Sequence, residues 1–469
     1  MIGDVSLWLV FAILIGASIA LYDGFHRKWM TELETFGPAV PLSYTANKAA
    51  WVFAGVVLPF MLLHGRKLRL AFTESLLLWF VFCTVAYARD FAYFKLPRVP
   101  VYVTDVILVL ALVGFAWPRL RLPKSKYVLL LAGFSLLGIA GALRGIQQHM
   151  QLTDVLRDLS VPVYALFALP ALYSRRSKTF LEQFWLMILC GAVIATLIGA
   201  SWSVMQPGMR RYVVMGMYVP IALLLTVLAA AGRQFSTRVA IPLMLLLGLG
   251  VVLCNARTVY VGLAVASGAL LLTGLGSGRT KTILMTAVIV FCVMAVLITV
   301  RLRRHEDAQP VQRGTNHATT ALRPDDNTEW RLLLWKEAGR RFLQHPVLGE
   351  GYGVPLTFEL ERTDTKPHNI YLYVFYKMGL VGGAVFLAML LAPTIAAWRA
   401  IRKHADRPGA YVLRGLFVCQ VFLFCWGALN PLIETPFLAS IFWMNLGLML
   451  RMAGRMESGG KRIAAAAAA

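Results

Sequence analysis

One stretch decides the fold: it runs through Trp330-Arg331-Leu332-Leu333-Leu334-Trp335, His345-Pro346-Val347-Leu348-Gly349-Glu350-Gly351-Tyr352-Gly353, Pro367-His368-Asn369-Ile370-Tyr371-Leu372 and Gly379-Leu380-Val381-Gly382-Gly383. These residues end the longest polar interval of the chain and lead directly into an apolar run. The junction therefore marks the place where an external loop meets a membrane helix.

The rest of the chain is strongly apolar. Of its 469 residues, 58% are hydrophobic and only 15% are charged, and the mean hydropathy is +0.67. Soluble domains are about half apolar and about one-quarter charged, so the composition predicts an all-α integral membrane protein. The net charge of +23 would favour a nucleic-acid partner in a soluble protein. Here the basic residues lie in short loops between apolar runs, where they indicate topology and contact with membrane lipids instead.

Candidate membrane helices follow one another along most of the chain. A spanning helix needs about 20 mostly apolar residues, and about 14 segments meet that condition. Their approximate cores are 5–22, 48–64, 71–88, 100–117, 126–143, 155–173, 179–202, 212–231, 239–255, 258–275, 282–300, 369–397, 411–428 and 436–450. The run 5–22 has no basic n-region or small-residue cleavage site, so we interpret it as a membrane helix and not a signal peptide.

The charges of the loops orient these helices. Lys and Arg gather in alternate short loops, among them 64–70, 118–126 and 398–414. Because basic residues resist translocation, we expect these loops and both termini to be cytoplasmic. The expected domains are membrane helices in 1–300, a large loop at 301–368 on the other side, further membrane helices in 369–450 and a cytoplasmic tail at 451–469. In a Gram-negative bacterium the loop would face the periplasm.

The second half of that loop has the pattern of an amphipathic helix. Thr328 can cap a helix in which Trp335, Ala338 and Phe342 share one face, with Arg331 one turn before Trp335. Such a helix would lie on the bilayer surface or pack on the membrane domain, with the indole of Trp335 at the interface. A proline and a series of glycines at 346–353 then predict a tight turn.

Three arginines are candidate ligands for a diphosphate. Arg257 stands between two apolar runs with almost no loop around it, and Arg210 and Arg211 end the preceding short external loop. Guanidinium groups bind phosphate oxygens bidentately. An interfacial Arg257 that reaches toward water, and ordinary loop residues at 210 and 211, are the alternatives. On the predicted topology these residues, Arg331 and His368 all lie at one face of the membrane.

His368 and Asn369 stand where the loop enters the next helix. Histidine titrates near neutrality, so His368 could accept the proton of a hydroxyl group, and a helix start disfavours its charged form. The alternative is a polar residue at an interface. Asp105 and Glu434 lie near the same face and could orient His368 or pair with the arginines. The absence of common metal and hydrolase motifs disfavours a metal, a nucleotide-sugar donor and a hydrolase triad.

The motifs quoted at the start resemble those of the O-antigen ligase and polymerase superfamily of bacterial membrane glycosyltransferases. The similar features are Arg331 and Trp335 on a loop helix, the His-Pro-x-x-Gly-x-Gly turn from His345, and His368-Asn369 before a glycine-rich helix. The resemblance implies a glycosyltransferase-C-like fold and a metal-independent, inverting transfer without a cofactor. It also assigns His368 as the essential histidine, and Arg257 with Arg210 or Arg211 as diphosphate ligands.

This resemblance implies a donor glycan on undecaprenyl diphosphate and a hydroxyl of a second glycan as acceptor. We expect a multi-pass protein of the bacterial inner membrane with its site at the periplasmic face, in contact with other polysaccharide-assembly proteins. Polymerisation of repeat units is favoured, and ligation to lipid A-core is the alternative. A lipid or polysaccharide transporter is the rival from another class, and it would show internal repeats. An inert scaffold is the third possibility.

Overall fold

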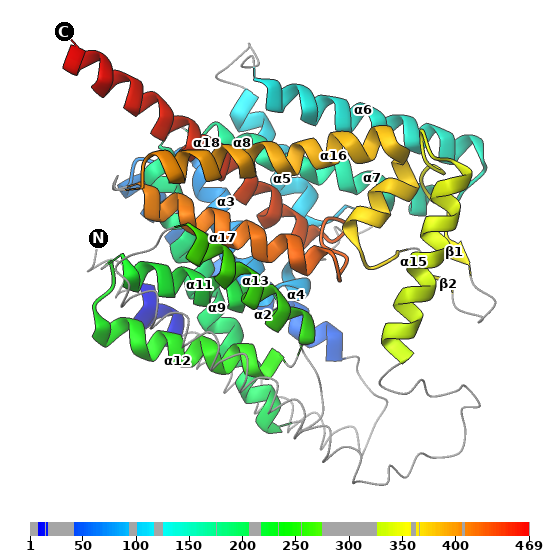
Figure 1. The fold of residues 1–469 in the computed structure, drawn as a ribbon. Coiled ribbons are helices and arrows are strands. Elements are labelled where there is room, and N and C mark those ends of the chain that lie inside the picture. The colour runs from blue at the N-terminus through cyan, green and yellow to red at the C-terminus, as the bar shows by residue number, and fades with distance from the viewer. Residues whose placement is uncertain are drawn as a thin grey trace, which may run out of the picture.

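The computed structural model describes residues 8–14, 16, 42–92, 101–116, 125–174, 176–205, 217–232, 234–254, 256–273, 326–357, 363–364, 366–405 and 409–468. Apart from one short hairpin, the elements are helices (Figure 1). They are α2 (Leu42–Lys67), α3 (Phe72–Tyr87), α4 (Arg89–Ala92), α5 (Val103–Ala116), α6 (Lys126–Gln147), α7 (Leu152–Ala165), α8 (Ala168–Leu172), α9 (Ser177–Met205), α11 (Tyr218–Ala231), α12 (Thr237–Cys254), α13 (Arg257–Leu272), α15 (Asp326–Gln344), β1 (Leu356–Thr357), β2 (Thr363–Asp364), α16 (Ile370–Lys403), α17 (Ala410–Gly427) and α18 (Pro436–Ala468).

The predicted class, an all-helical polytopic membrane protein, is confirmed. Within the described residues, 7 helical segments are long and apolar enough to cross a membrane, and several shorter apolar helices accompany them. The longer segments are 126–147, 152–172, 177–200, 237–254, 370–403, 410–427 and 436–458. Of the predicted spans, 282–300 lies outside the described residues and 5–22 lies partly outside them.

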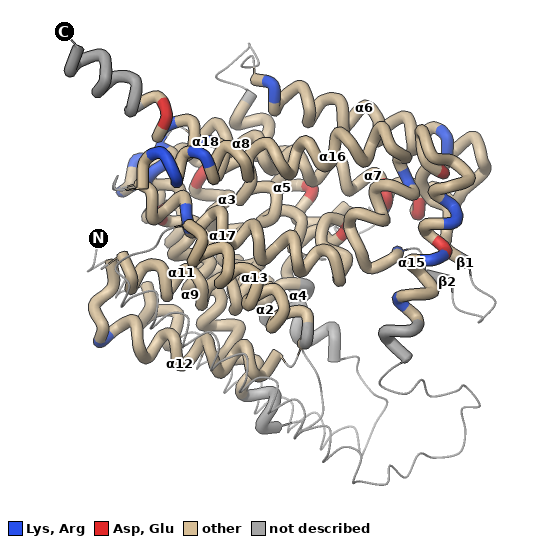
Figure 2. The backbone as a smooth tube through the Cα atoms, in the orientation of Figure 1, with Lys and Arg blue, Asp and Glu red and all other residues tan. Residues whose placement is uncertain are grey.

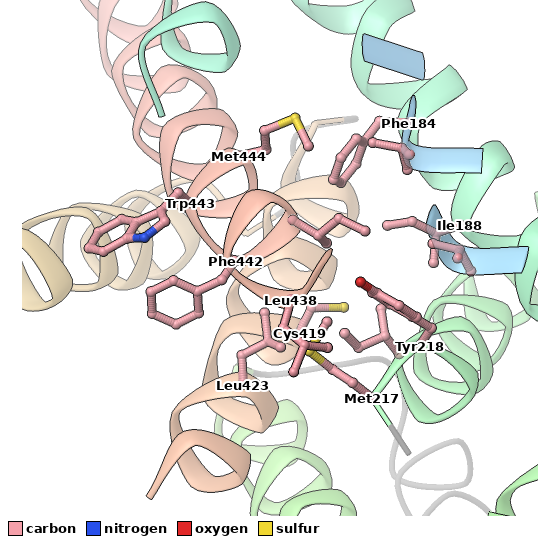
Figure 3. Packing of buried hydrophobic residues seen from close by; sticks show 14 of the residues in the cluster. Phe184, Ile188, Met217, Tyr218, Cys419, Leu423, Leu438, Phe442, Trp443 and Met444 are labelled. Atoms are coloured by element: carbon pink, nitrogen blue, oxygen red, sulfur yellow. The ribbon is translucent and has the colours of Figure 1, made fainter. Parts of the chain in front are cut away.

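Apolar side chains fill the middle of the bundle. Figure 3 shows Phe184 of α9 and Tyr218 of α11 turned toward α18, whereas Phe442 of α18 lies on the opposite side of that helix. These residues and Cys419 of α17 are at most 3% exposed. Helices α9, α11, α17 and α18 therefore form one continuous core. The helices that surround it keep leucines and valines on their outer faces, as lipid contact requires.

Charged residues lie at the two ends of this bundle. Figure 2 shows Lys and Arg gathered where α16 ends and α17 begins, at the end opposite α15. Around α15 both signs of charge occur. This separation agrees with the expected positive-inside bias, and the assignment of the basic end to the cytoplasm stays a prediction.

Helix α16, which corresponds to the predicted span 369–397, is not straight. Gly379 interrupts it with φ 65° and ψ −166°, a conformation that is open to glycine almost alone. The aromatic ring of Phe375 packs on Gly383, and the rings of Tyr371 and Phe386 lie 6.3 Å apart. In a straight helix residues 371 and 386 would be separated by about 22 Å along the axis. The chain therefore bends sharply at Gly379, while residues 370–397 of the predicted span lie within α16.

The two parts of α16 form a tight helical hairpin, which Figure 1 shows as a sharp bend near the start of the helix. We call residues 370–378 the arm. Residues 380–403 still exceed the length of about 20 residues that a membrane span needs. The arm is therefore not needed to cross the membrane. It can instead position the residues that precede it.

Candidate functional site

His368 stands immediately before the arm. Its backbone has φ 51°, which is uncommon for a residue with a side chain. Asn369 is the N-cap of the arm, because its side-chain oxygen accepts hydrogen bonds from the backbone N–H groups of Tyr371 and Leu372 at 3.0 and 3.1 Å. The cap fixes where the helix starts, so it also fixes the direction from which His368 enters.

Two tryptophans of α15 frame His368. The indole N–H of Trp335 donates to the carbonyl of Pro367 at 2.8 Å, and the ring of Trp330 lies 5.3 Å from the imidazole of His368. Helix α15 begins at Asp326, two residues before the predicted cap Thr328. Its inner face includes Ala338, which is 1% exposed. Of the two placements expected for this helix, the structure has the one against the membrane domain, and the indole of Trp335 bonds to protein.

Arg331 follows Trp330 on the same helix and is half-buried. Its position next to the tryptophan that contacts His368 agrees with a place at the edge of the site. Arg331 therefore lies on the end of α15 that contacts His368 through Trp330.

Glu434 is one of the two candidate acids, and its carboxylate is buried. It lies in the loop between α17 and α18, its side chain is 1% exposed, and it forms an ion pair with Lys366 at 2.9 Å. Burial raises the pKa of the Glu434 carboxyl, while the charges of Lys366 and His368 lower it in part. The role of Glu434 toward His368 stays a prediction.

Asp105, the other candidate acid, has two described partners. It accepts hydrogen bonds from the backbone N–H of Tyr102 at 2.8 Å and from the hydroxyl of Tyr164 at 3.0 Å. These contacts tie the start of α5 to α7, and a role of Asp105 toward His368 stays a prediction. In the described part of the chain, no three His, Cys, Asp or Glu side chains cluster as a metal site would need.

The arginines proposed for the diphosphate are placed only in part. Arg210 and Arg211 lie outside the described residues, and for Arg257 the structure describes the backbone at the first position of α13. Gly262, early in α13, packs on Phe422 near the end of α17, and Gly427 at the end of α17 packs on Ile370. The start of α13 therefore lies at the same end of the bundle as the start of the arm.

A turn of residues 345–354, which we call the glycine turn, closes the apex of the helical hairpin. The N–H groups of Glu350 and Gly351 donate to the carbonyls of Tyr376 and Lys377 at 2.9 and 3.1 Å. In the opposite direction, the N–H groups of Leu380 and Val381 donate to the carbonyls of Pro346 and Val347 at 2.7 and 3.2 Å. The turn thus pairs backbone groups that the break at Gly379 leaves without helical partners.

The glycines of this turn are required by its shape. Gly349, Gly351 and Gly353 have φ of 71°, 100° and 83°. Helix α6 packs against the turn and forms hydrogen bonds with it. The Arg144 side chain donates to the carbonyl of Gly349, and the N–H of Tyr352 donates to the carbonyl of Gly141 at 3.1 Å. The sequence predicted a turn here, and the structure adds that it is wedged between α6 and α16.

Sequence reasoning missed one polar contact, an ion pair between Asp158 of α7 and Lys377 of the arm. The two side chains are 2% and 0% exposed, and the carboxylate and ammonium lie 2.8 Å apart. A signal was present for Lys377, which stands inside an otherwise apolar run, where ionisable residues have a specific role by default.

These features define a class: a polytopic membrane protein with a polar site at one end of its helix bundle, where a histidine, a buried carboxylate and tryptophans converge. Residues 242–387 match the family model described as O-antigen ligase. This stretch contains Arg257, α15, the glycine turn, His368 and the arm, and the match supports membership of the O-antigen ligase and polymerase superfamily. No curated protein matches the chain.

Proposed function

We propose that this protein transfers a glycan from undecaprenyl diphosphate to a hydroxyl group of a second glycan, with inversion at the anomeric carbon and without a metal. The setting of His368 carries the proposal: the histidine stands at a capped helix start with the ring of Trp330 5.3 Å away, within the stretch that matches the family. The site would face the outer leaflet of a bacterial inner membrane.

His368 is the proposed general base. Its imidazole accepts the proton of the acceptor hydroxyl while that oxygen bonds to the anomeric carbon and the bond to the diphosphate breaks. Glu434 is the proposed supporting acid of the site. Its ion pair with Lys366 at 2.9 Å offsets part of the cost of burying the carboxylate.

The diphosphate leaving group needs positive charge. Arg257 and one or both of Arg210 and Arg211 are the proposed ligands, since bidentate guanidinium groups bind phosphate oxygens and offset the charge that develops in the transition state. Arg331 is a proposed supporting residue. Its place beside Trp330 puts a further cation at the edge of the site.

In this proposal Trp335 and Asn369 do not take part in the reaction but hold the backbone around the histidine in place. The indole bond to Pro367 and the cap of the arm hold the backbone on both sides of His368. A polar site fixed in this way is pre-organised, so little reorganisation accompanies the reaction.

Repeat-unit polymerisation is the favoured reaction, and ligation to lipid A-core is the second candidate, which the description of the matched family favours. Purified protein is supplied with one undecaprenyl-diphosphate-linked repeat. A polymerase forms a ladder of longer glycans from this substrate alone, whereas a ligase forms product only after lipid A-core is added.

The same purified protein also tests whether the chain is a transporter and not a glycosyltransferase. Movement of labelled substrate across liposomes without any covalent change, together with no product under either acceptor condition, would contradict the proposed transfer. An excess of a metal chelator should leave the product yield unchanged, because the proposal assigns the electrostatic work to arginines.

A further inference from the structure

The buried Asp158–Lys377 pair joins three segments that are distant in sequence. The Asp158 carboxylate on α7 accepts hydrogen bonds from the Tyr373 hydroxyl and the Gly353 backbone N–H, both at 2.8 Å, in addition to the Lys377 ammonium. Lys377 also donates to the carbonyl of Val354 at 2.7 Å. One carboxylate therefore connects α7, the arm and the glycine turn.

A buried ion pair is not by itself a device for stability, because the loss of hydration offsets much of the attraction. The pair can, however, fix the orientation of the arm relative to α7. Tyr373 and Lys377 are one helical turn apart, so they project from the same face of the arm. Contacts from both residues to one carboxylate restrict the rotation of the arm about its own axis and its distance from α7.

The effect of this restriction is largest at the far end of the arm. His368 lies nine residues before Lys377, which corresponds to about 14 Å along a helix. A tilt of about 10° at Lys377 would thus move the imidazole by about 2 Å. Displacements of about 1 Å at a reacting group can lower a rate about 100-fold.

We propose that Asp158 and Lys377 are positioning residues, which hold the arm at one angle to α7 and thereby fix where His368 stands. The kinetic part of this inference rests on the proposed role of His368. The geometric part concerns the arm alone and can be measured without substrate.

The test is a distance between two spin labels in full-length protein in which the native cysteines have been replaced. Labels are attached at Leu156→Cys on α7, where the side chain is 48% exposed, and at Leu372→Cys on the arm. We expect a single narrow distance in this parent. The variant Asp158→Asn/Lys377→Met removes both charges together, so no unpaired charge remains buried and the protein should still fold.

In that variant we expect the distance to shift by about 1 Å or to broaden by a similar amount, because residue 372 is closer to Lys377 than His368 is. A matched control removes another buried polar contact, the hydrogen bond of 2.8 Å between Asn445 and Gln420 on α18 and α17. Gln420→Leu/Asn445→Leu should leave the distance unchanged. A folded Asp158→Asn/Lys377→Met variant with the narrow distance of the parent would overturn the inference.

Kinetics separate this inference from the proposed function. With active parent protein, Asp158→Asn/Lys377→Met should lower kcat about 100-fold and leave KM for the lipid-linked donor nearly unchanged, as misplacement of the base predicts. Wild-type kcat in the folded variant would refute the positioning role. A parent with no transfer activity would instead contradict the proposed function, and the distance would still decide whether the pair holds the arm.

Discussion

The core between α9, α11, α17 and α18 and the junction around His368 are both well packed, but they are built differently. The core uses apolar side chains on regular helices, such as Phe184 and Phe442. The junction uses glycines with positive φ, a capped arm and a few buried charges from segments far apart in sequence. In the core, many similar apolar contacts each contribute to stability. At the junction, single residues make the contacts that fix the structure. Substitutions should therefore have different effects in the two regions.

The largest expected effect is at His368. His368→Ala should lower glycan transfer by about 100- to 10,000-fold, the usual contribution of a general base, while the protein stays folded. His345→Ala is the matched control, because His345 is exposed on the neighbouring glycine turn. Initial rates of product formation check both variants. Full activity of His368→Ala would remove the catalytic assignment.

Arg257→Lys should also reduce transfer strongly, by about tenfold or more, since Lys keeps the charge but loses the bidentate geometry. The affinity for the undecaprenyl-diphosphate donor should fall in parallel. Arg238→Lys, an exposed position at the other end of the α12–α13 pair, should have no effect. Unchanged kinetics of Arg257→Lys would indicate an arginine that only reaches toward water at the membrane surface.

Gly379→Ala tests how far the free energy of unfolding depends on the junction. A methyl group there would collide with the backbone of Val347, and φ of 65° is strained for alanine. We expect a loss of about 1–3 kcal/mol. Gly248→Ala in α12 meets no atom within 4 Å and should be neutral or up to about 1 kcal/mol stabilising. Thermal unfolding in detergent measures both. Equal midpoints for the two variants would show that the hairpin does not depend on this glycine.

Trp335→Phe should have a smaller effect. It removes the hydrogen bond from the indole to Pro367 and keeps most of the ring, at a cost of about 0.5–1.5 kcal/mol. We expect transfer to fall by up to about tenfold through looser placement of His368. Trp398→Phe, near the opposite end of α16, should retain wild-type transfer. If both variants are fully active, the indole bond does not position the histidine.

The smallest expected effect concerns pH. Hydrogen bonds from Arg340 and then Arg341 lower the pKa of Glu337 from 4.5 to about 2. A lowered acid pKa stabilises the folded state above pH 4.5, and this contribution is lost as the pH falls toward about 2. Amide exchange in α15, corrected for its intrinsic pH dependence, should therefore accelerate in this range. In Glu337→Gln it should be faster already at neutral pH, while the exposed Glu457→Gln should match wild type.

The sequence was sufficient to predict most of the fold, because lipid contact demands long apolar helices. The runs at 126–143, 179–202 and 411–428 correspond to α6, α9 and α17. The hairpin in α16 could not be predicted in this way, because the run 369–397 is apolar on both sides of Gly379. Its conformation depends on the glycine turn, which is a tertiary contact.

For the candidate site, the sequence indicated His368, Asn369, Trp335 and Glu434, and the structure brings them to one end of the bundle. It also suggested Asp105, whose carboxylate accepts a hydrogen bond from the Tyr164 hydroxyl, and its part in the site stays a prediction. A sequence shows that a charge stands in an apolar run, but it does not show which charge will be its partner. The Asp158–Lys377 pair was missed for that reason.

The backbone bonds between the glycine turn and the apex of α16 have a consequence for how the protein is made. Residues 380–403 contain a complete membrane span, so the translocon can insert them independently of the arm. Until Pro346–Gly351 docks, however, the amides at the apex stand unpaired next to lipid, which is unfavourable. Pairing of these amides therefore depends on the docking of a segment that is synthesised before the span itself.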